Sequence, residues 1–287
     1  MNPQPGVRME DEVEDVLGKA MRGLGLSPAD LAERASLSAK EVNAALEGNV
    51  DPSVFSSLAA ALGLGAKALL ELSGGGAAPV IELPEPFAML NTPHPVPGYA
   101  EMTVNSYLLL PEAEPSIAIA FDTGSDATQH RRWLSATGRK LSHLFLTHTH
   151  KDHVAAYTGL IQAPIPVMAP EREPFGDAEP VRHGQVFDLA GYHIEARETS
   201  GHSPGGLTYR IDGLGLPIAL VGDAIFCRSM GKVPPERYRA AMQMIEAEIL
   251  NLPDETILCP GHGPLTTVEF EKQHNPFFNA ALEPSLS

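Results

Sequence analysis

The sequence of 287 residues has only two cysteines, Cys227 and Cys259, which are too few for a disulfide framework. This scarcity is typical of proteins in a reducing compartment, so we expect a cytoplasmic protein. The chain also lacks an apolar run of the roughly 18 residues that a membrane-spanning helix needs. Its first 15 residues are acidic and lack the apolar core of a secretory signal. We therefore expect no association with a membrane.

Positive charge is scarce as well. The chain has 20 Lys and Arg residues against 36 Asp and Glu residues, a formal net charge of −16. A chain this acidic repels phosphate backbones, which weighs against nucleic acid as the main ligand. Its content of hydrophobic residues, 43%, is that of an ordinary globular protein. At roughly 150 residues per domain, the length suggests two domains.

A stretch rich in glycine separates two regions of different character. Residues 73–79, SGGGAAP, have three glycines and a proline without periodicity, which predicts a flexible linker. We expect an all-helical domain at residues 1–72. Short β-rich runs alternate with helical stretches at residues 80–287, a pattern typical of an α/β domain. The expected strands lie at 105–110, 117–121, 144–147, 192–197, 207–211 and 218–221, and the expected helices include 131–137 and 235–251.

The first region has the signals of a helix, a tight turn and a second helix. Ser27 is a suitable N-cap and Pro28 suits the first helical position, which predicts a helix through Ala35. After the turn at 36–38, we expect helices at 39–46, from after Asp51-Pro52 through residue 64, and at 66–72. This order is the helix-turn-helix arrangement.

Residues 13–72 resemble the lambda-repressor-like helix-turn-helix family. The resemblance lies in LSPADLA (26–32), ASLS (35–38), ALEGN (45–49) and LAAALGL (58–64). It implies that residues 39–46 are a recognition helix, with Ser38, Lys40 and Asn43 as readers of a DNA groove. Residues 1–76, however, have six basic and eleven acidic residues, a balance of −5. Two interpretations stay open: DNA binding, or a module that keeps its packing and serves for homodimerisation or docking, which the acidic balance favours.

Four side chains suited to metals lie within six residues: His148, His150, Asp152 and His153. An apolar run, 144–146, precedes them and predicts a buried strand that ends in a loop with these side chains. Residues i and i+2 of an extended segment point the same way, so His148 and His150 can chelate one ion. Asp152 and His153 follow where the chain turns into a helix, and they can face a second ion.

Three further candidates, His202, Asp223 and His262, each lie in a turn with glycine after an apolar run. Glycine lets the backbone bend tightly and approach a ligand closely. Imidazole suits transition metals, and a carboxylate can bridge two ions. Isolated histidines are usually surface residues, but chance does not account for five of eleven histidines in three such motifs. We interpret the other six as structural or solvated: His94, His130, His143, His183, His193 and His274.

Residues 79–276 resemble the metallo-β-lactamase superfamily, and most of all its glyoxalase II-like branch. The matching motifs are DTG (122–124), THTHKDH (147–153), SGHSPG (200–205), GDAIF (222–226), PGHGPLTT (260–267) and EKQHNPF (271–277). The resemblance implies an αββα sandwich with the site at one edge of its two sheets. It also implies a first metal site of His148, His150 and His202, a second of Asp152, His153 and His262, and Asp223 as the bridge.

This ligand set predicts a hydrolase with two divalent metal ions, by preference Zn²⁺, with Fe or Mn as alternatives. Such ions lower the pKa of a bridging water from 15.7 toward about 7. A metal-bound hydroxide can then attack an activated acyl small molecule such as a thioester or lactone. Asp152 and Asp223 are the expected catalytic groups: both orient the hydroxide, and one passes a proton to the leaving group.

Two alternatives stay open. A one-iron persulfide dioxygenase would use two histidines and one aspartate, here His148, His202 and Asp223. A transcription regulator would use the metallohydrolase-fold domain as a sensor. Among hydrolase substrates we do not expect a glutathione thioester, because the 25 residues after His262 leave no room for the helical domain that grips glutathione in authentic glyoxalase II.

Overall fold

The computed structural model describes residues 7–49 and 51–280. The outer ends of the two expected domains, residues 1–6 and 281–287, lie outside the described residues, as does residue 50. The helices are α1 Val13–Gly23, α2 Pro28–Ala35, α3 Ala39–Leu46, η1 Pro52–Val54, α4 Phe55–Leu62, α5 Ala66–Ser73, α6 Thr128–Thr137, α7 Lys151–Val154, α8 Tyr157–Leu160, α9 Pro235–Ile245, η2 Glu246–Leu250 and α10 Val268–His274. The strands are β1 Phe87–Pro93, β2 Thr103–Leu109, β3 Ile117–Phe121, β4 Lys140–Phe145, β5 Val167–Pro170, β6 Glu179–Val181, β7 Val186–Leu189, β8 Tyr192–Glu198, β9 Leu207–Asp212, β10 Ile218–Gly222, β11 Ile225–Phe226, β12 Ser229–Met230, β13 Ile257–Pro260 and β14 Thr266–Thr267.

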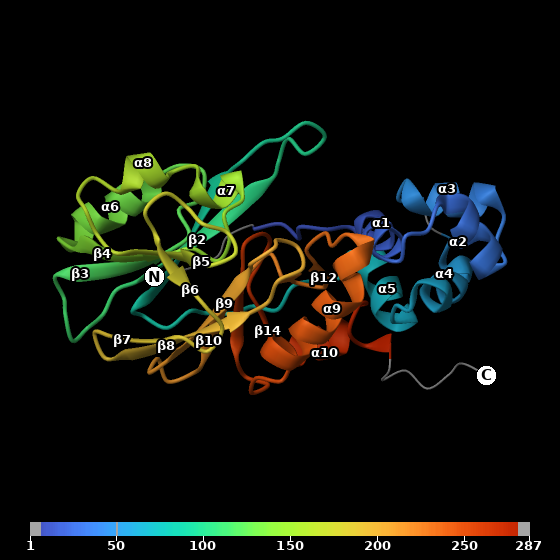
Figure 1. Cartoon of the computed structure of the whole chain (residues 1–287). Helices are drawn as coiled ribbons and strands as arrows, with labels where there is room; N and C mark the ends of the chain where they lie inside the picture. The colour runs from blue at the N-terminus through green and yellow to red at the C-terminus, as the bar shows by residue number, and fades with distance from the viewer. Residues whose placement is uncertain (1–6, 50, 281–287) are drawn as a thin grey trace.

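Two six-stranded sheets form the middle of the larger region (Figure 1). The first has the order β1-β2-β3-β4-β5-β6, and the second has the order β14-β13-β10-β9-β8-β7. Each sheet mixes parallel and antiparallel pairs; β3, β4, β5 and β6 run parallel, as do β10 and β13. Parallel neighbours end at the same edge of a sheet, so the loops that follow them come together there.

Aromatic and branched side chains fill the space between the sheets. The rings of Phe121 and Phe145 stack with centroids 5.3 Å apart, and Tyr209 of the second sheet meets Phe145 edge-on at 5.2 Å. The outer face of the first sheet packs against Trp133 and Leu134 of α6. The outer face of the second sheet packs against α9, η2 and α10. The layers are therefore helix, sheet, sheet, helix, which confirms the expected αββα sandwich.

The five N-terminal helices gather at one end of the sandwich (Figure 1). The bounds of α2 and α3 agree with the sequence prediction, and each helix begins with a capping box, Ser27 with Asp30 and Ser38 with Glu41. In such a box, side chain and backbone satisfy each other's free groups at the helix start. We call residues 13–73 the helical segment. Its membership of the helix-turn-helix family, DNA binding and dimerisation remain predictions.

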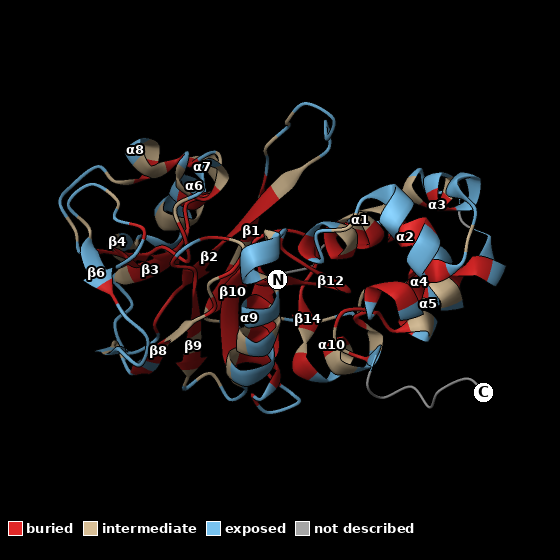
Figure 2. Ribbon diagram, turned by 45° about the vertical axis from the view of Figure 1, so that its right-hand side comes forward, coloured by how far each residue is buried: buried red, intermediate tan, exposed pale blue. Residues whose placement is uncertain are grey.

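The helical segment packs directly on the sandwich. One hydrophobic cluster contains Leu17 of α1, Leu69 of α5, Ile245 of α9 and Val268 of α10. Figure 2 shows buried stretches, in red, on the helices of both regions. The ammonium group of Lys19 is buried, pairs with Asp11 and donates a hydrogen bond of 2.8 Å to the carbonyl of Met230. The division into domains at residues 73–79 and the flexibility of this linker remain predictions.

The expected helix at 235–251 has a change of winding within it, since the α-helix α9 gives way at Glu246 to the π-helical turn η2. Among the described residues, no helix has the length and apolar content to cross a bilayer.

Candidate metal centre

The loop that carries four of the candidate ligands begins where β4 ends. Its backbone leaves the sheet because the N–H group of Thr147 donates to Oδ1 of Asp122, at 2.8 Å, rather than to a neighbouring strand. The hydroxyl of Thr147 donates to the other oxygen of the same carboxylate, also at 2.8 Å. Asp122 itself has a φ of 55°, a conformation uncommon outside glycine. The short helix α7 follows and contains Asp152 and His153, where the chain was expected to turn into a helix.

The other three candidates follow strands of the second sheet. His202 lies between β8 and β9, Asp223 follows β10, and His262 follows β13. Because β10 and β13 are parallel neighbours, Asp223 and His262 come to the same edge. The approach depends on glycine: a Cβ atom added to Gly261 would lie 2.2 Å from Oδ1 of Asp223.

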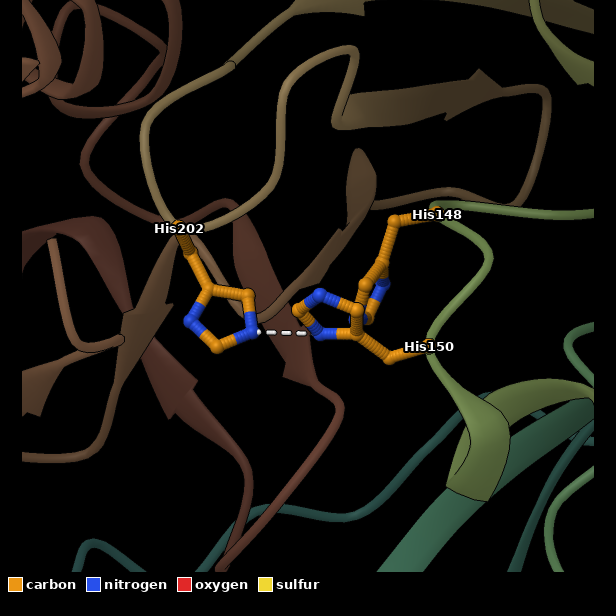
Figure 3. Close-up of side chains that lie close together, drawn as sticks. All are labelled: His148, His150 and His202. Atoms are coloured by element: carbon orange, nitrogen blue, oxygen red, sulfur yellow. Dashed lines mark hydrogen bonds between the residues drawn. The ribbon is translucent and has the colours of Figure 1, made fainter. Parts of the chain in front are cut away.

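The structure brings all seven predicted residues together. We call His148, His150 and His202 the first group, and Asp152, His153 and His262 the second group; in each, the potential ligand atoms lie within 4.8 Å of one another. Figure 3 shows His148 and His150 extending from one loop toward His202, whose Nε2 is 2.9 Å from Nδ1 of His150. A third combination, His148, His153 and Asp223, meets the same distance criterion.

Asp223 lies between the two groups. Its Oδ2 is 3.3 Å from Nε2 of His202 in the first group and 3.3 Å from Nε2 of His262 in the second. Nε2 of His262 is also 3.1 Å from Oδ2 of Asp152. A carboxylate in this position can reach cations in both groups, as a bridging ligand must.

Several buried polar atoms of this centre have no hydrogen-bond partner. They are Nε2 of His148, Nε2 of His153 and Oδ1 of Asp223. A buried polar atom without a partner costs free energy, unless an ion or water satisfies it. These atoms face one another, and imidazole nitrogen with carboxylate oxygen is a donor set suited to Zn²⁺ and similar ions. The residues therefore fit a metal.

The outer nitrogens of three rings are held by the protein. Nδ1 of His153 meets Oδ2 of Asp122 at 2.8 Å, Nδ1 of His262 donates to the carbonyl of Thr103 at 2.7 Å, and Nδ1 of His202 donates to the carbonyl of Lys232 at 3.2 Å. Such bonds fix the ring orientation and leave Nε2 free for a metal.

The buried carboxylates of the centre favour positive charge on the groups beside them. Burial lowers the pKa of His148 and of His202, which keeps these rings neutral and able to bind a metal. Burial also lowers the pKa of His153, but the carboxylates of Asp223 and Asp122 outweigh it and raise this pKa to about 10. His262 beside Asp223 behaves likewise, with a pKa well above its usual value. Without a metal, protons on these two rings balance the carboxylates.

Two supporting carboxylates, Asp122 and Glu173, have no sequence signal that assigns them a role. Asp122 belongs to the DTG motif but had no assigned role. Glu173 accepts hydrogen bonds from the loops on both sides of the first group. Burial raises its pKa, but hydrogen bonds from Ser203, Gly205 and Thr149 outweigh this and lower it. Its neighbours in the sequence, Glu171 and Arg172, show no pattern that marks it.

The remaining histidines and the cysteines lie outside these groups. Among the described residues, none of the other six histidines joins a group of potential metal ligands. His130 is fully buried without a hydrogen-bond partner for either nitrogen. Both cysteines are buried, and Cys259 belongs to the core between the sheets.

Comparisons with known proteins give a matching family and several relatives. The Metallo-beta-lactamase superfamily matches residues 100–262, which is more than half of the chain. The "Probable metallo-hydrolase YqgX" of Bacillus subtilis is 26% identical over 200 residues, covering 61% of this chain and 92% of that protein. The "Hydroxyacylglutathione hydrolase GloC" of Haemophilus influenzae is 28% identical over 188 residues, covering 57% of this chain and 88% of that protein.

Among solved structures, the BLEG-1 B3 metallo-beta-lactamase is similar with a TM-score of 0.56 and 26% identity. The superposition covers 66% of this chain and 99% of that one. The similar part is thus about the size of the sandwich alone.

Proposed function

The chain belongs to the metallo-β-lactamase superfamily, and from this and the geometry of the centre we infer that it is a metal-dependent hydrolase of activated acyl compounds. One observation carries the proposal: the buried atoms of His148, His153 and Asp223 face one another without hydrogen-bond partners. In a folded protein such a set costs free energy until a proton, a water or an ion satisfies it, and a metal ion would satisfy all three atoms at once.

We assign one divalent cation to the first group and one to the second, with Asp223 shared between them. Zn²⁺ is our preferred metal because histidine nitrogen and carboxylate oxygen dominate the donor set. Bound cations would lower the pKa of a coordinated water and so provide a nucleophile near neutral pH.

The carboxylates supply the proton chemistry. Oδ1 of Asp223 accepts no hydrogen bond and lies 3.2 Å from Nε2 of His153, so with that ring on a metal it could accept a proton from water and orient the nucleophile. Burial raises the pKa of Asp152, but the hydrogen bond with His262 and the nearby His153 outweigh this and hold its pKa below the usual range. In the metal-free chain Asp152 is therefore ionised at neutral pH, the form that can bind a cation. It can take up a proton and return it to the leaving group.

We propose a thioester, a lactone or a related activated acyl small molecule as substrate. Two relatives support this class through their names, one a hydroxyacylglutathione hydrolase and the other a B3 metallo-beta-lactamase. Both names describe the attack of water on an activated carbonyl. Both cysteines are buried, so neither is placed to attack a substrate, and a metal-bound water would supply the nucleophile for that step.

The one-iron alternative uses His148, His202 and Asp223. It leaves the second group without a role, although Asp152, His153 and His262 meet the same distance criterion as the first group. The two-ion proposal gives a role to all seven residues, and we prefer it for that reason.

The test is a panel of small acyl substrates with the purified full chain. After removal of metal and reconstitution with zinc, we expect hydrolysis of a thioester or a lactone, loss of activity with a chelator, and recovery on addition of zinc. No hydrolysis of any thioester, lactone or β-lactam by the zinc-loaded protein would contradict the proposal. Oxygen consumption with a persulfide by the iron-loaded protein would favour the alternative.

A further inference from the structure

Glu173 joins two of the loops that carry histidines. It lies three residues beyond β5 and only 8% of its surface is exposed. Its Oε2 accepts hydrogen bonds from the N–H group of Thr149, at 3.0 Å, and from the hydroxyl of the same residue, at 3.1 Å. Its Oε1 accepts a hydrogen bond of 2.6 Å from the N–H group of Gly205. One carboxylate thus holds both loops, one with each oxygen.

The two anchor points lie close to the ligands of the first group. Thr149 stands between His148 and His150, and Gly205 is three residues after His202. Hydrogen bonds from backbone N–H groups to a buried carboxylate are stronger than those between neutral groups. The bonds of Glu173 therefore restrain the backbone that aims all three histidines.

Within the first group, His150 has the least support of other kinds. Nδ1 of His148 lies 3.0 Å from the hydroxyl of Thr147, and Nδ1 of His202 donates to the carbonyl of Lys232. In the second group, Asp122 and Thr103 hold the outer nitrogens of His153 and His262. His150, by contrast, is exposed, and among the described residues its ring hydrogen-bonds to His202, another member of the first group. The orientation of the His150 ring therefore depends on its backbone, because its ring partner is itself a member of the first group.

We propose that Glu173 is a positioning residue for the metal centre: by joining the loop of His148 and His150 to the loop of His202, it sets how tightly the first group binds its ion. The inference rests on the proposed function, because it needs a metal in the first group. It assigns no chemical step to Glu173, which touches neither metal nor substrate.

The direct test is Glu173→Gln, which keeps the size of the side chain. A glutamine has one oxygen and one NH₂ group, so at least one loop would face a donor instead of an acceptor. We expect zinc binding to weaken about 10–100-fold at one of the two sites, the range for substitutions of groups that orient metal ligands. Affinity at the other site should stay at its wild-type value.

The matched control is Glu171→Gln. Glu171 lies two residues away on the same segment and is exposed, and its carboxylate pairs with Arg182 rather than with a histidine loop. Both variants would be stripped of metal and titrated with zinc against a chromophoric chelator. Absorption spectra of the Co²⁺-loaded proteins would report the coordination geometry, which we expect to change in Glu173→Gln alone.

The outcomes separate this inference from the proposed function. If the wild-type chain binds no zinc, the proposed function fails first. If the wild-type chain binds two ions and Glu173→Gln binds both as tightly, only the role of Glu173 is wrong. An equal loss at both sites would also overturn it, since that result indicates a general role in folding.

A second variant covers the case in which Glu173→Gln does not fold. Thr149→Val removes the hydroxyl donor to Glu173 but leaves the backbone bond. We expect a smaller loss of affinity than for Glu173→Gln, again at one site. Unchanged affinity in a Thr149→Val variant would then count against the proposal.

Discussion

The helical segment and the ligand loops of the metal centre obtain their structures from different sources. In the helical segment, the signals are local: Ser27 caps α2 through Asp30 three residues later, and Ser38 caps α3 through Glu41. In the ligand loops, the decisive contacts are remote in sequence. Thr147 depends on Asp122, 25 residues away, and the side chain of Asn105 donates to the carbonyl of Pro260, 155 residues away.

This difference predicts where substitutions act. Loss of a local signal should reduce the stability of one helix by a small amount and leave the metal centre intact. Loss of a remote contact or of a ligand should disturb metal binding while the helices persist. The helical segment and α9 share one hydrophobic cluster, so a loss of stability in the segment could reach the sandwich. The substitutions below measure whether it does.

The largest expected effect is that of His148→Ala. His148 belongs to two of the three groups of potential ligands, so its loss should remove more than the 10–100-fold in metal affinity expected for a supporting residue. We expect turnover to fall to background, while the far-ultraviolet circular dichroism keeps the helical signal of the wild type. Full activity with bound metal in this variant would overturn the site assignment.

A pair of glycines compares the two regions directly. In Gly261→Ala, the new Cβ atom would collide with Oδ1 of Asp223, and we expect a loss of about 100-fold in turnover, typical of a displacement near 1 Å. In Gly18→Ala, on α1, the new Cβ has no atom within 4 Å, and we expect a gain of up to about 1 kcal/mol in stability. Kinetics and thermal unfolding measure both. If both variants changed turnover by the same factor, the proposed difference between the two regions would be wrong.

Acid sensitivity should arise in the sandwich through His130. Burial lowers the pKa of His130 to about 4, below the unfolded value of 6.5. As the pH falls below 6.5, the unfolded chain takes up a proton that the folded chain does not, so stability is lost. Between pH 6.5 and 5, this residue should account for about 2 kcal/mol.

The variant His130→Leu should remove that contribution. Denaturant unfolding of metal-free protein at several pH values measures it, and metal is left out because acid also releases metal. Ser135→Ala, at an exposed position of the same helix α6, is the matched control: it removes no titratable group and should keep the wild-type pH dependence. If the unfolding free energy of His130→Leu fell with pH as steeply as that of the wild type between pH 6.5 and 5, His130 would not be the source of the acid sensitivity.

The smallest expected effect is that of Ser27→Ala. The hydroxyl of Ser27 accepts a hydrogen bond from the N–H group of Asp30, and its loss should cost about 1 kcal/mol. Metal content and turnover should not change. A fall in metal content would show instead that the helical segment supports the metal centre.

Much of the fold could be predicted where the signals are local. The predicted bounds of α2, α3 and β3 agree with the structure because caps and an apolar run define them. The strand β6 lies outside the expected strand ranges. It contains Pro180 and exists because Met168 of β5 pairs with Glu179. The short strands of a sheet depend on partners that no local pattern reveals.

The same holds for the candidate site. The seven residues could be predicted because each belongs to a dense motif or lies next to glycine. They lie together because each follows the end of a strand. Their supports, Asp122 and Glu173, could not be assigned from the sequence. Their roles depend on which loops the fold brings to them.

The most direct test of the account is the metal content of the purified full chain after reconstitution with zinc and removal of excess ion. Elemental analysis should find two zinc ions per chain, one for each of the two groups joined by Asp223. A chain that retains no zinc, or that binds a single iron and no second ion, would contradict it.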